Sequence, residues 1–135
     1  MRKGFVISTF DMVNVADLDL LDQVQQVCDE VTVVVLGDDY AERLHGRAPV
    51  IPENERHGLV AALRSTDEVV LCEQEEQLPR RGEADVTLYS DEKGLAGKVD
   101  VVLTPTRRSV SSQLRNALDH QAHTTNRSDD EDLSA

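Results

Sequence analysis

Short apolar runs alternate along the chain with longer segments whose apolar residues recur every three or four positions. The run Gly4–Phe10 predicts a strand, and Glu30–Gly37 is nearly continuous in β-branched residues, as in a central parallel strand covered on both faces. Three further runs predict shorter strands, over Val69–Cys72, Val86–Tyr89 and Val99–Leu103. The pattern therefore predicts about five strands, with the first two side by side.

The segment between the first two strands has helical spacing. Its apolar residues fall at three- and four-residue steps, which predicts a helix whose inward face consists of Leu18, Leu21, Val24 and Cys28. A second helix is predicted over 53–65, with Pro52 at its first position and packing through Leu59, Ala62 and Leu63. We expect a polar connection over 38–50 and a solvated charged segment over 73–83.

The C-terminal part predicts one more helix and a tail. Val110, Leu114, Ala117 and Leu118 share one face of a helix that begins near Ser109 or Ser111, where a serine caps the free N–H groups, and ends near residue 122. Residues 123–135 contain almost nothing to bury, so conformational entropy favours a flexible acidic tail. We therefore expect one folded domain over residues 1–122 and a tail over 123–135.

Strands that alternate with helices predict an α/β fold: a Rossmann-like, three-layer parallel sheet of about five strands with helices on both faces. In such a fold the ligand crevice lies outside the carboxyl ends of the strands, at the point where the strand order reverses. The segment 8–17, which joins the first strand to the first helix, is expected at this crevice.

Charge narrows the classes of partner. The 135 residues carry a formal net charge of -12, which argues against nucleic acid or an anionic membrane as the main partner.

The first apolar run, 5–7, is too short for a signal peptide or a membrane span, and we expect a cytoplasmic protein. Cys28 and Cys72 lie in apolar contexts and fit core packing better than metal or redox chemistry.

Three ordered stretches carry a resemblance to a known family. They are Thr9-Phe10-Asp11 with the four residues 14–17, the stretch His45-Gly46-Arg47 through Glu55-Arg56, and the stretch Val60 through Arg64 and Asp67-Glu68-Val69. Together they resemble the cytidylyltransferase-like nucleotidylyltransferases, in particular the glycerol-3-phosphate cytidylyltransferase type. The resemblance covers most of residues 4–118. It implies the fold described above and transfer of a nucleotide from CTP or ATP, with Mg²⁺, to a phosphorylated alcohol with loss of pyrophosphate.

The resemblance also implies a nucleotide site and an oligomer. Transferred position by position, the nucleotide-binding residues would be Thr9, Phe10, Asp11, Asn14, Arg64, Arg107, Arg108, Ser111 and Ser112. The last four belong to a segment that resembles the family's triphosphate-binding Arg-Thr-x-Gly-Ile-Ser-Thr series, with its glycine replaced and its arginine displaced. The family's habit of dimerising implies a homodimer or a protein partner.

The residues depart from the family pattern where the chemistry would take place. The motif His-x-Gly-His reads Asn14-Val15-Ala16-Asp17, and the lysine expected before Gly-Arg is His45. Transfer of a nucleotidyl group depends on donors and positive charges around the phosphates. A carboxylate at residue 17 has the wrong sign, because two like charges about 4 Å apart repel by about 4 kcal/mol at a dielectric of about 20.

These residues are compatible with two functions. The first is a degenerate family member that binds nucleotide weakly or not at all and acts as a partner or regulatory subunit. The second is an active enzyme in which Asp11 or Asp17 holds a divalent metal while Arg64, Arg107 and Arg108 neutralise the triphosphate. Against the metal, Asp17 and Asp19 fit the first turn of a helix and Asp22 fits an exposed position. His45 fits a loop residue better than a catalytic one.

Overall fold

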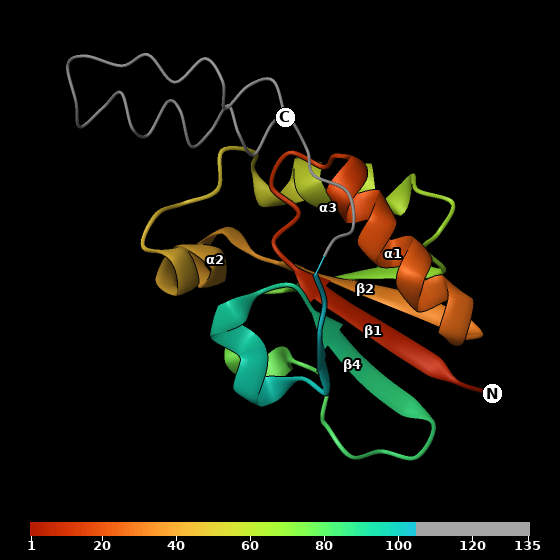
Figure 1. Cartoon of the computed structure of the whole chain (residues 1–135). Coiled ribbons are helices and arrows are strands. Elements are labelled where there is room, and N and C mark those ends of the chain that lie inside the picture. Colours follow the sequence, from red (N-terminus) through yellow and green to blue (C-terminus); the bar gives the residue numbers. More distant parts are fainter. Residues whose placement is uncertain (105–135) are drawn as a thin grey trace, which may run out of the picture.

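Five parallel strands form one sheet in the computed structural model, which describes residues 1–104 (Figure 1). The strands are β1 (Lys3–Ser8), β2 (Glu30–Leu36), β3 (Glu68–Cys72), β4 (Val86–Ser90) and β5 (Val101–Val102). Their order is β3-β2-β1-β4-β5, and each neighbouring pair is parallel. The five predicted strands and the pairing of the first two are confirmed. The predicted last helix and acidic tail lie outside the described residues.

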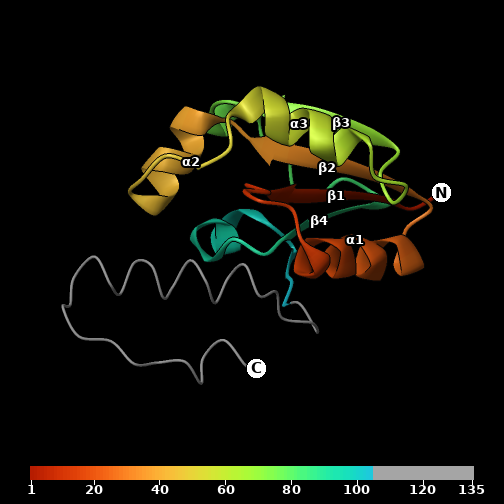
Figure 2. The ribbon, with the colours of Figure 1, turned by 90° about the horizontal axis from the view of Figure 1, so that it is seen from above.

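Helices cover both faces of this sheet, so the predicted three-layer architecture is confirmed. Helices α1 (Val15–Val27) and α3 (Glu53–Ala61) lie on one face, which is turned upward in Figure 1. Figure 2 shows that they lie at different places along the sheet, α3 next to β2 and β3 and α1 nearer to β1 and β4. Helix α2 (Asp38–His45) and the short 3₁₀ helices η1 (Glu75–Gln77) and η2 (Lys93–Lys98) lie on the other.

The alternation of side chains along the central strands builds two cores. Val31, Val33 and Val35 of β2 pack with the residues of α1 and α3, whereas Val34 and Leu36 pack on the α2 side. All five side chains are fully buried, because β2 has a strand on each side and helices on both faces. The continuous β-branched run of the sequence therefore reflects a central strand.

The expected polar connection over 38–50 is partly wrong, because α2 occupies its first eight residues. Acidic residues Asp38 and Asp39 lie in the first turn, where they favour the helix dipole, and Gly46 ends the helix with a φ of 85°. Only Tyr40 and Ala41 of this helix are buried. So short an apolar face is hard to distinguish from a loop by spacing.

Three predicted inward positions are also wrong, those of Leu18, Leu59 and Ala62, all of which are exposed. Leu18 on α1 is 40% exposed and Leu59 on α3 is 52% exposed, while Leu20 and Val60 are buried. The predicted inward residues Leu21, Val24 and Cys28 are buried, and Leu63 packs against the same core, so each predicted face is only partly right. Helix α3 is shorter than predicted, since Ala62 caps its C-terminus, and Pro52 is its N-cap, not its first helical residue.

The carboxyl ends of β1 and β4 lie side by side at the point where the strand order reverses. Strand β1 ends at Ser8, two residues before the predicted end, and Phe10 and Met12 then take positive φ values of 56° and 57°. This turn leads the chain out of the sheet and into α1. Among the described residues, no helix is both long and apolar enough to cross a bilayer.

Candidate functional site

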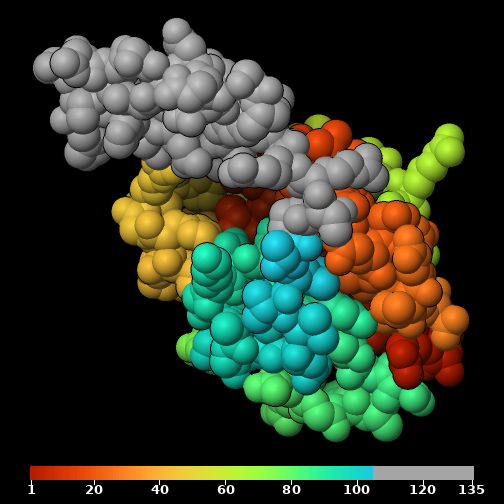
Figure 3. All heavy atoms as spheres, viewed as in Figure 1, coloured from red at the N-terminus to blue at the C-terminus, as the bar shows by residue number. Residues whose placement is uncertain are grey.

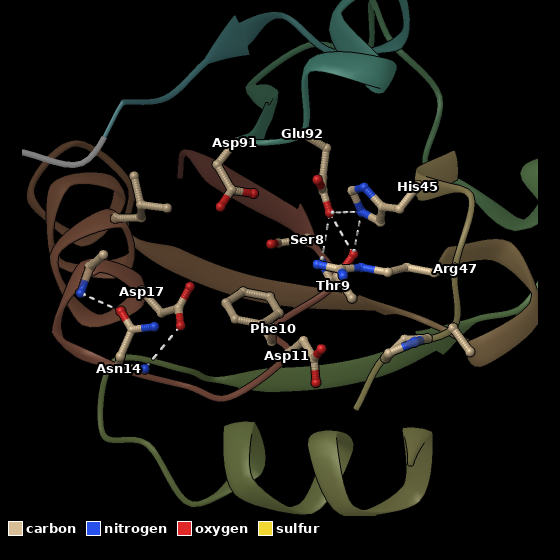
Figure 4. A pocket seen from close by; sticks show the side chains of 14 residues that line it. Ser8, Thr9, Phe10, Asp11, Asn14, Asp17, His45, Arg47, Asp91 and Glu92 are labelled. Carbon is tan, nitrogen blue, oxygen red and sulfur yellow. Dashed lines mark hydrogen bonds and ion pairs between the residues drawn. The ribbon is translucent and has the colours of Figure 1, made fainter. Parts of the chain in front are cut away.

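An open pocket of about 420 Å³ lies at the carboxyl ends of β1 and β4, where the parallel sheet predicts a ligand crevice. In Figure 3 the red N-terminal segment is visible in a hollow between the gold α2 region and the orange helix α1. Figure 4 shows side chains from several separate segments turned toward this space. The described lining residues are Ser8, Thr9, Phe10, Asp11, Asn14, Ala16, Asp17, Leu20, His45, Arg47, Ala48, Pro49, Asp91 and Glu92.

Thr9, His45 and Glu92 meet on one wall of the pocket (Figure 4). The Thr9 hydroxyl donates to Oε2 of Glu92, and the Thr9 backbone N–H donates to the same oxygen at 3.3 Å. Nε2 of His45 lies 3.1 Å from Glu92 Oε2 and 3.2 Å from Thr9 Oγ1. His45 is the last residue of α2, so its expected place in a loop is wrong. The cluster joins the end of α2 to the segment after β4.

The start of α1 forms the opposite wall and caps itself. The Asn14 side chain accepts hydrogen bonds from the backbone N–H of Ala16, at 2.9 Å, and of Asp17. In return, the Asp17 carboxylate accepts the backbone N–H of Asn14 at 3.0 Å, which completes a capping box. Asn14 and Asp17 therefore satisfy the helix N-terminus, and Asp17 lies in the predicted first turn. Asp19 is buried and accepts a hydrogen bond from Gln23.

Asp11 fixes the loop that closes the outer side of the pocket. One carboxylate oxygen of Asp11 accepts the N–H of Val50 and the other accepts the N–H of Ile51, both at 2.9 Å. Both oxygens are thus engaged by backbone groups. This contact holds the lining residues Ala48 and Pro49 near the turn after β1.

Arg56 contacts the pocket-lining residue Thr9 and is fully buried. Its guanidinium donates to the carbonyl oxygens of Thr9 and Leu36 at 2.6 Å and of Ile51 at 2.8 Å. It also forms an ion pair of 2.8 Å with Asp38. One side chain of α3 therefore connects the ends of β1 and β2, the start of α2 and the loop held by Asp11.

Asp91 follows β4 directly and faces the end of β1. Its carboxyl group points toward Ser8 in Figure 4, and its Oδ1 is buried without a hydrogen-bond partner. Burial raises the pKa of this carboxyl above its usual value, and the charge of Glu92 raises it further, while a hydrogen bond from Ser8 opposes the shift. A carboxyl with a raised pKa in a pocket is a candidate for binding or proton transfer.

The structure brings together six of the predicted site residues and separates one. Those that line the pocket are Thr9, Phe10, Asp11, Asn14, Asp17 and His45. Arg64 is exposed and does not line it. The other four predicted residues, Arg107, Arg108, Ser111 and Ser112, lie outside the described part of the chain.

Sequence reasoning missed the contributions of Asp91, Glu92 and Arg56. Asp91 and Glu92 directly follow β4, which the sequence predicted as a strand. Their place in the pocket depends on the pairing of β4 with β1, and the sequence pattern did not predict that pairing. Arg56 was included in a family motif, but its burial depends on segments far apart in the sequence that meet at the carboxyl ends of β1 and β2.

Acidic side chains outnumber basic ones among the described lining residues. Asp11, Asp17, Asp91 and Glu92 are acidic, whereas Arg47 and His45 are the basic ones. Within residues 1–104, no group of three or more His, Cys, Asp or Glu side chains is arranged to hold a metal ion.

Comparisons with known proteins agree with this architecture. The Cytidylyltransferase-like family model matches residues 5–122. The bifunctional protein HldE of Acidiphilium cryptum (strain JF-5) is 36% identical over 78 residues, which are 57% of this chain and 16% of that relative. The chain therefore corresponds to a small part of that protein.

A solved structure supports the fold alone. The lipopolysaccharide core biosynthesis protein from Thermoplasma volcanium GSS1 superposes with a TM-score of 0.55 and 20% identity, over 90% of this chain and 89% of that one. The family match covers well over half of the chain and agrees with the strand order and the position of the pocket. The chain belongs to the cytidylyltransferase-like family.

Proposed function

We propose that this chain is a family member of the glycerol-3-phosphate cytidylyltransferase type that has lost nucleotidyl transfer and acts as a partner or regulatory subunit. The observation that carries the proposal is the capping box at the start of α1, formed by Asn14 and Asp17. In the family these positions belong to histidines that stabilise phosphate charge. Here their side chains stabilise the helix itself.

The first consequence of the capping box is a loss of donors. A helix N-terminus binds anions because its first N–H groups lack partners within the helix. The N–H groups of Ala16 and Asp17 already donate to Asn14, and the N–H of Asn14 donates to Asp17. A phosphate would have to displace these hydrogen bonds before it gained its own.

The second consequence is electrostatic. The Asp17 carboxylate supplies the negative charge that a helix N-terminus favours, and it occupies the place that a phosphate would need. Ala16, at the position of the motif glycine, adds a Cβ where close approach to the backbone is wanted. Both effects weaken phosphate binding without disturbing the fold.

Calorimetry with CTP and with ATP, each with and without Mg²⁺, tests the proposal. We expect no binding heat from the wild-type chain at millimolar nucleotide and no pyrophosphate release with glycerol 3-phosphate. The combined variant Asn14→His, Ala16→Gly, Asp17→His restores the motif, and we expect it to gain nucleotide-dependent heat. A second variant at an exposed site of the same helix, Asp22→His, is the matched control and should gain none.

Turnover by the wild-type chain would overturn the proposal. If pyrophosphate release required Mg²⁺ and disappeared in Asp17→Ala, Asp17 would be a metal ligand in an active transferase, which is the alternative function. Retained turnover in that variant would assign the activity to other residues. Either result would remove the case for a degenerate site.

An exposed sheet edge supports the proposed role as a partner. Strand β5 is an edge strand of the described sheet, and Val101 and Val102 are 38% and 46% exposed. An apolar edge is a template for pairing with another chain. Sedimentation velocity should show a concentration-dependent homodimer that Val102→Lys weakens, while Val27→Lys on α1 leaves it intact. A chain that stays monomeric over the same range would contradict a homodimer through this edge.

A further inference from the structure

One buried acceptor in the pocket is left without a donor. Three buried side-chain oxygens in the described part of the chain have no hydrogen-bond partner, those of Thr32, Thr66 and Asp91. Of these residues only Asp91 lines the pocket. Buried acceptors are nearly always paired, so an orphan beside an open pocket indicates a place for a donor from a ligand.

The neighbouring acids of the pocket are engaged by the protein itself. Asp11 accepts from two backbone N–H groups, Asp17 accepts from Asn14, and Glu92 accepts from Thr9. These carboxylates therefore contribute negative charge to the pocket while their hydrogen bonds hold its walls. Asp91 differs because its Oδ1 forms none.

The walls and the size of the pocket restrict the class of ligand. Phe10, Leu20, Ala48 and Pro49 contribute apolar surface, and the volume of about 420 Å³ is within the usual range for small molecules. The acidic side chains among the described lining residues repel phosphate, whereas a hydroxyl or amino group of a ligand can donate a hydrogen bond to Asp91. A small ring compound with several donors fits both features.

We infer that the pocket binds a phosphate-free small molecule rich in hydroxyl or amino groups, such as a nucleoside, with a donor on Asp91, and that it discriminates against the phosphorylated form. This inference rests on the proposed function, because it takes the phosphate-binding part of the site to be closed by Asn14 and Asp17. It adds to the proposed function a class of ligand, and it predicts that the unphosphorylated form binds more tightly than the phosphorylated forms. In a phosphate-binding site each added phosphate strengthens binding; here each weakens it.

The ligand series cytidine, CMP and CTP tests this order by calorimetry at neutral pH, without Mg²⁺. We expect cytidine to bind at millimolar concentration or below, with CMP about tenfold weaker and CTP weaker still, a tenfold step being about 1.4 kcal/mol. Ribose serves as a second phosphate-free probe that retains the hydroxyl groups but lacks the base.

Variants of Asp91 link the binding to the orphan acceptor. Asp91→Ala removes the acceptor and should weaken cytidine binding at least about tenfold, while Asp22→Ala on the exposed side of α1 should leave it unchanged. Asp91→Asn retains the size of the side chain, and it should bind more tightly than the alanine variant. Asp17→Asn removes one charge and should reduce the difference in affinity between cytidine and CMP. Circular dichroism confirms that each variant is folded.

The possible failures are distinguishable from those of the proposed function. If no phosphate-free probe binds, the inference is wrong, and the lack of nucleotidyl transfer stands. If affinity rises from cytidine to CTP without pyrophosphate release, the inference is wrong and the site retains phosphate binding. Rising affinity together with turnover overturns both. Binding of cytidine that is unaffected by Asp91→Ala places the ligand elsewhere and also overturns the inference.

Discussion

Replacement of Arg56 by methionine tests whether the pocket depends on a single buried cation. Methionine retains most of the length of the side chain but removes every donor. The substitution leaves the carbonyl oxygens of Thr9, Leu36 and Ile51 without the guanidinium, and it separates Asp38 from its ion-pair partner. The ends of β1 and β2 thereby lose their hydrogen bonds with Arg56.

The size of the effect follows from which partners can regain water. The bonds to Thr9 and Leu36 are buried, and each unsatisfied buried group costs about 1–3 kcal/mol. The Asp38 side chain is 40% exposed, so its charge is readily hydrated and adds little. We therefore expect a loss of about 3–5 kcal/mol, a large part of the roughly 5–15 kcal/mol by which a domain is stable.

Urea unfolding followed by circular dichroism measures this loss as a lower midpoint with an unchanged slope. Arg64→Met is the matched control, because Arg64 is exposed and forms no hydrogen bond or ion pair within the described residues; its effect should stay within about 0.5 kcal/mol. Arg56→Lys retains the charge and should lie between the two. A loss below about 1 kcal/mol in Arg56→Met would refute the assignment of Arg56 as the connection between these elements.

Three further substitutions probe separate parts of the structure. Asp91→Asn removes a carboxyl whose pKa is raised by burial, so the folded state of the wild type loses stability as pH rises above about 4. The stability of the Asn variant relative to wild type should therefore increase from acidic to neutral pH in urea titrations, and a difference that is independent of pH would contradict this. Gly4→Ala places a Cβ about 2.8 Å from Cys28 Sγ and should cost about 1–3 kcal/mol; adding Cys28→Ala should recover part of that cost, and strictly additive effects would show that there is no clash. Asn14→Ala removes the helix cap and should lower the free energy of unfolding by about 1 kcal/mol, whereas a neutral result would exclude a stabilising role for the cap.

The central part of the fold was predictable because its residues are buried on both sides. Strand β2 carries six buried residues in succession, and this continuous run leaves few alternatives to a central parallel strand. Helix α2 was not predictable in the same way, because only Tyr40 and Ala41 of its residues are buried, with Leu44 partly buried against the same core. The exposure of Leu18, Leu59 and Ala62 arises from how the helices pack on the sheet, which helical spacing specifies only approximately.

The part of the site that lies on the connection between β1 and α1 could be predicted from the sequence. The segment from Thr9 to Asp17 directly follows β1, and the strand pattern placed it at the crevice. Asp91 and Glu92 lie 74 or more residues further along the chain than Asp17, and only the pairing of β1 with β4 brings them to the same pocket. Long-range strand order is not encoded in local periodicity.

The acidic side chains of the pocket accept hydrogen bonds from the backbone that surrounds it. A site prepared for phosphate keeps N–H donors and cations without internal partners, and it is stabilised when the ligand arrives. Here the donors at the start of α1 are satisfied by Asn14 and Asp17, and the loop at Val50 and Ile51 is held by Asp11. The acidic side chains of Asp11 and Asp17 thus stabilise the walls of the pocket. If phosphate binding was lost as we propose, restoring it requires replacing Asn14 and Asp17 together, since either residue alone retains half of the capping box.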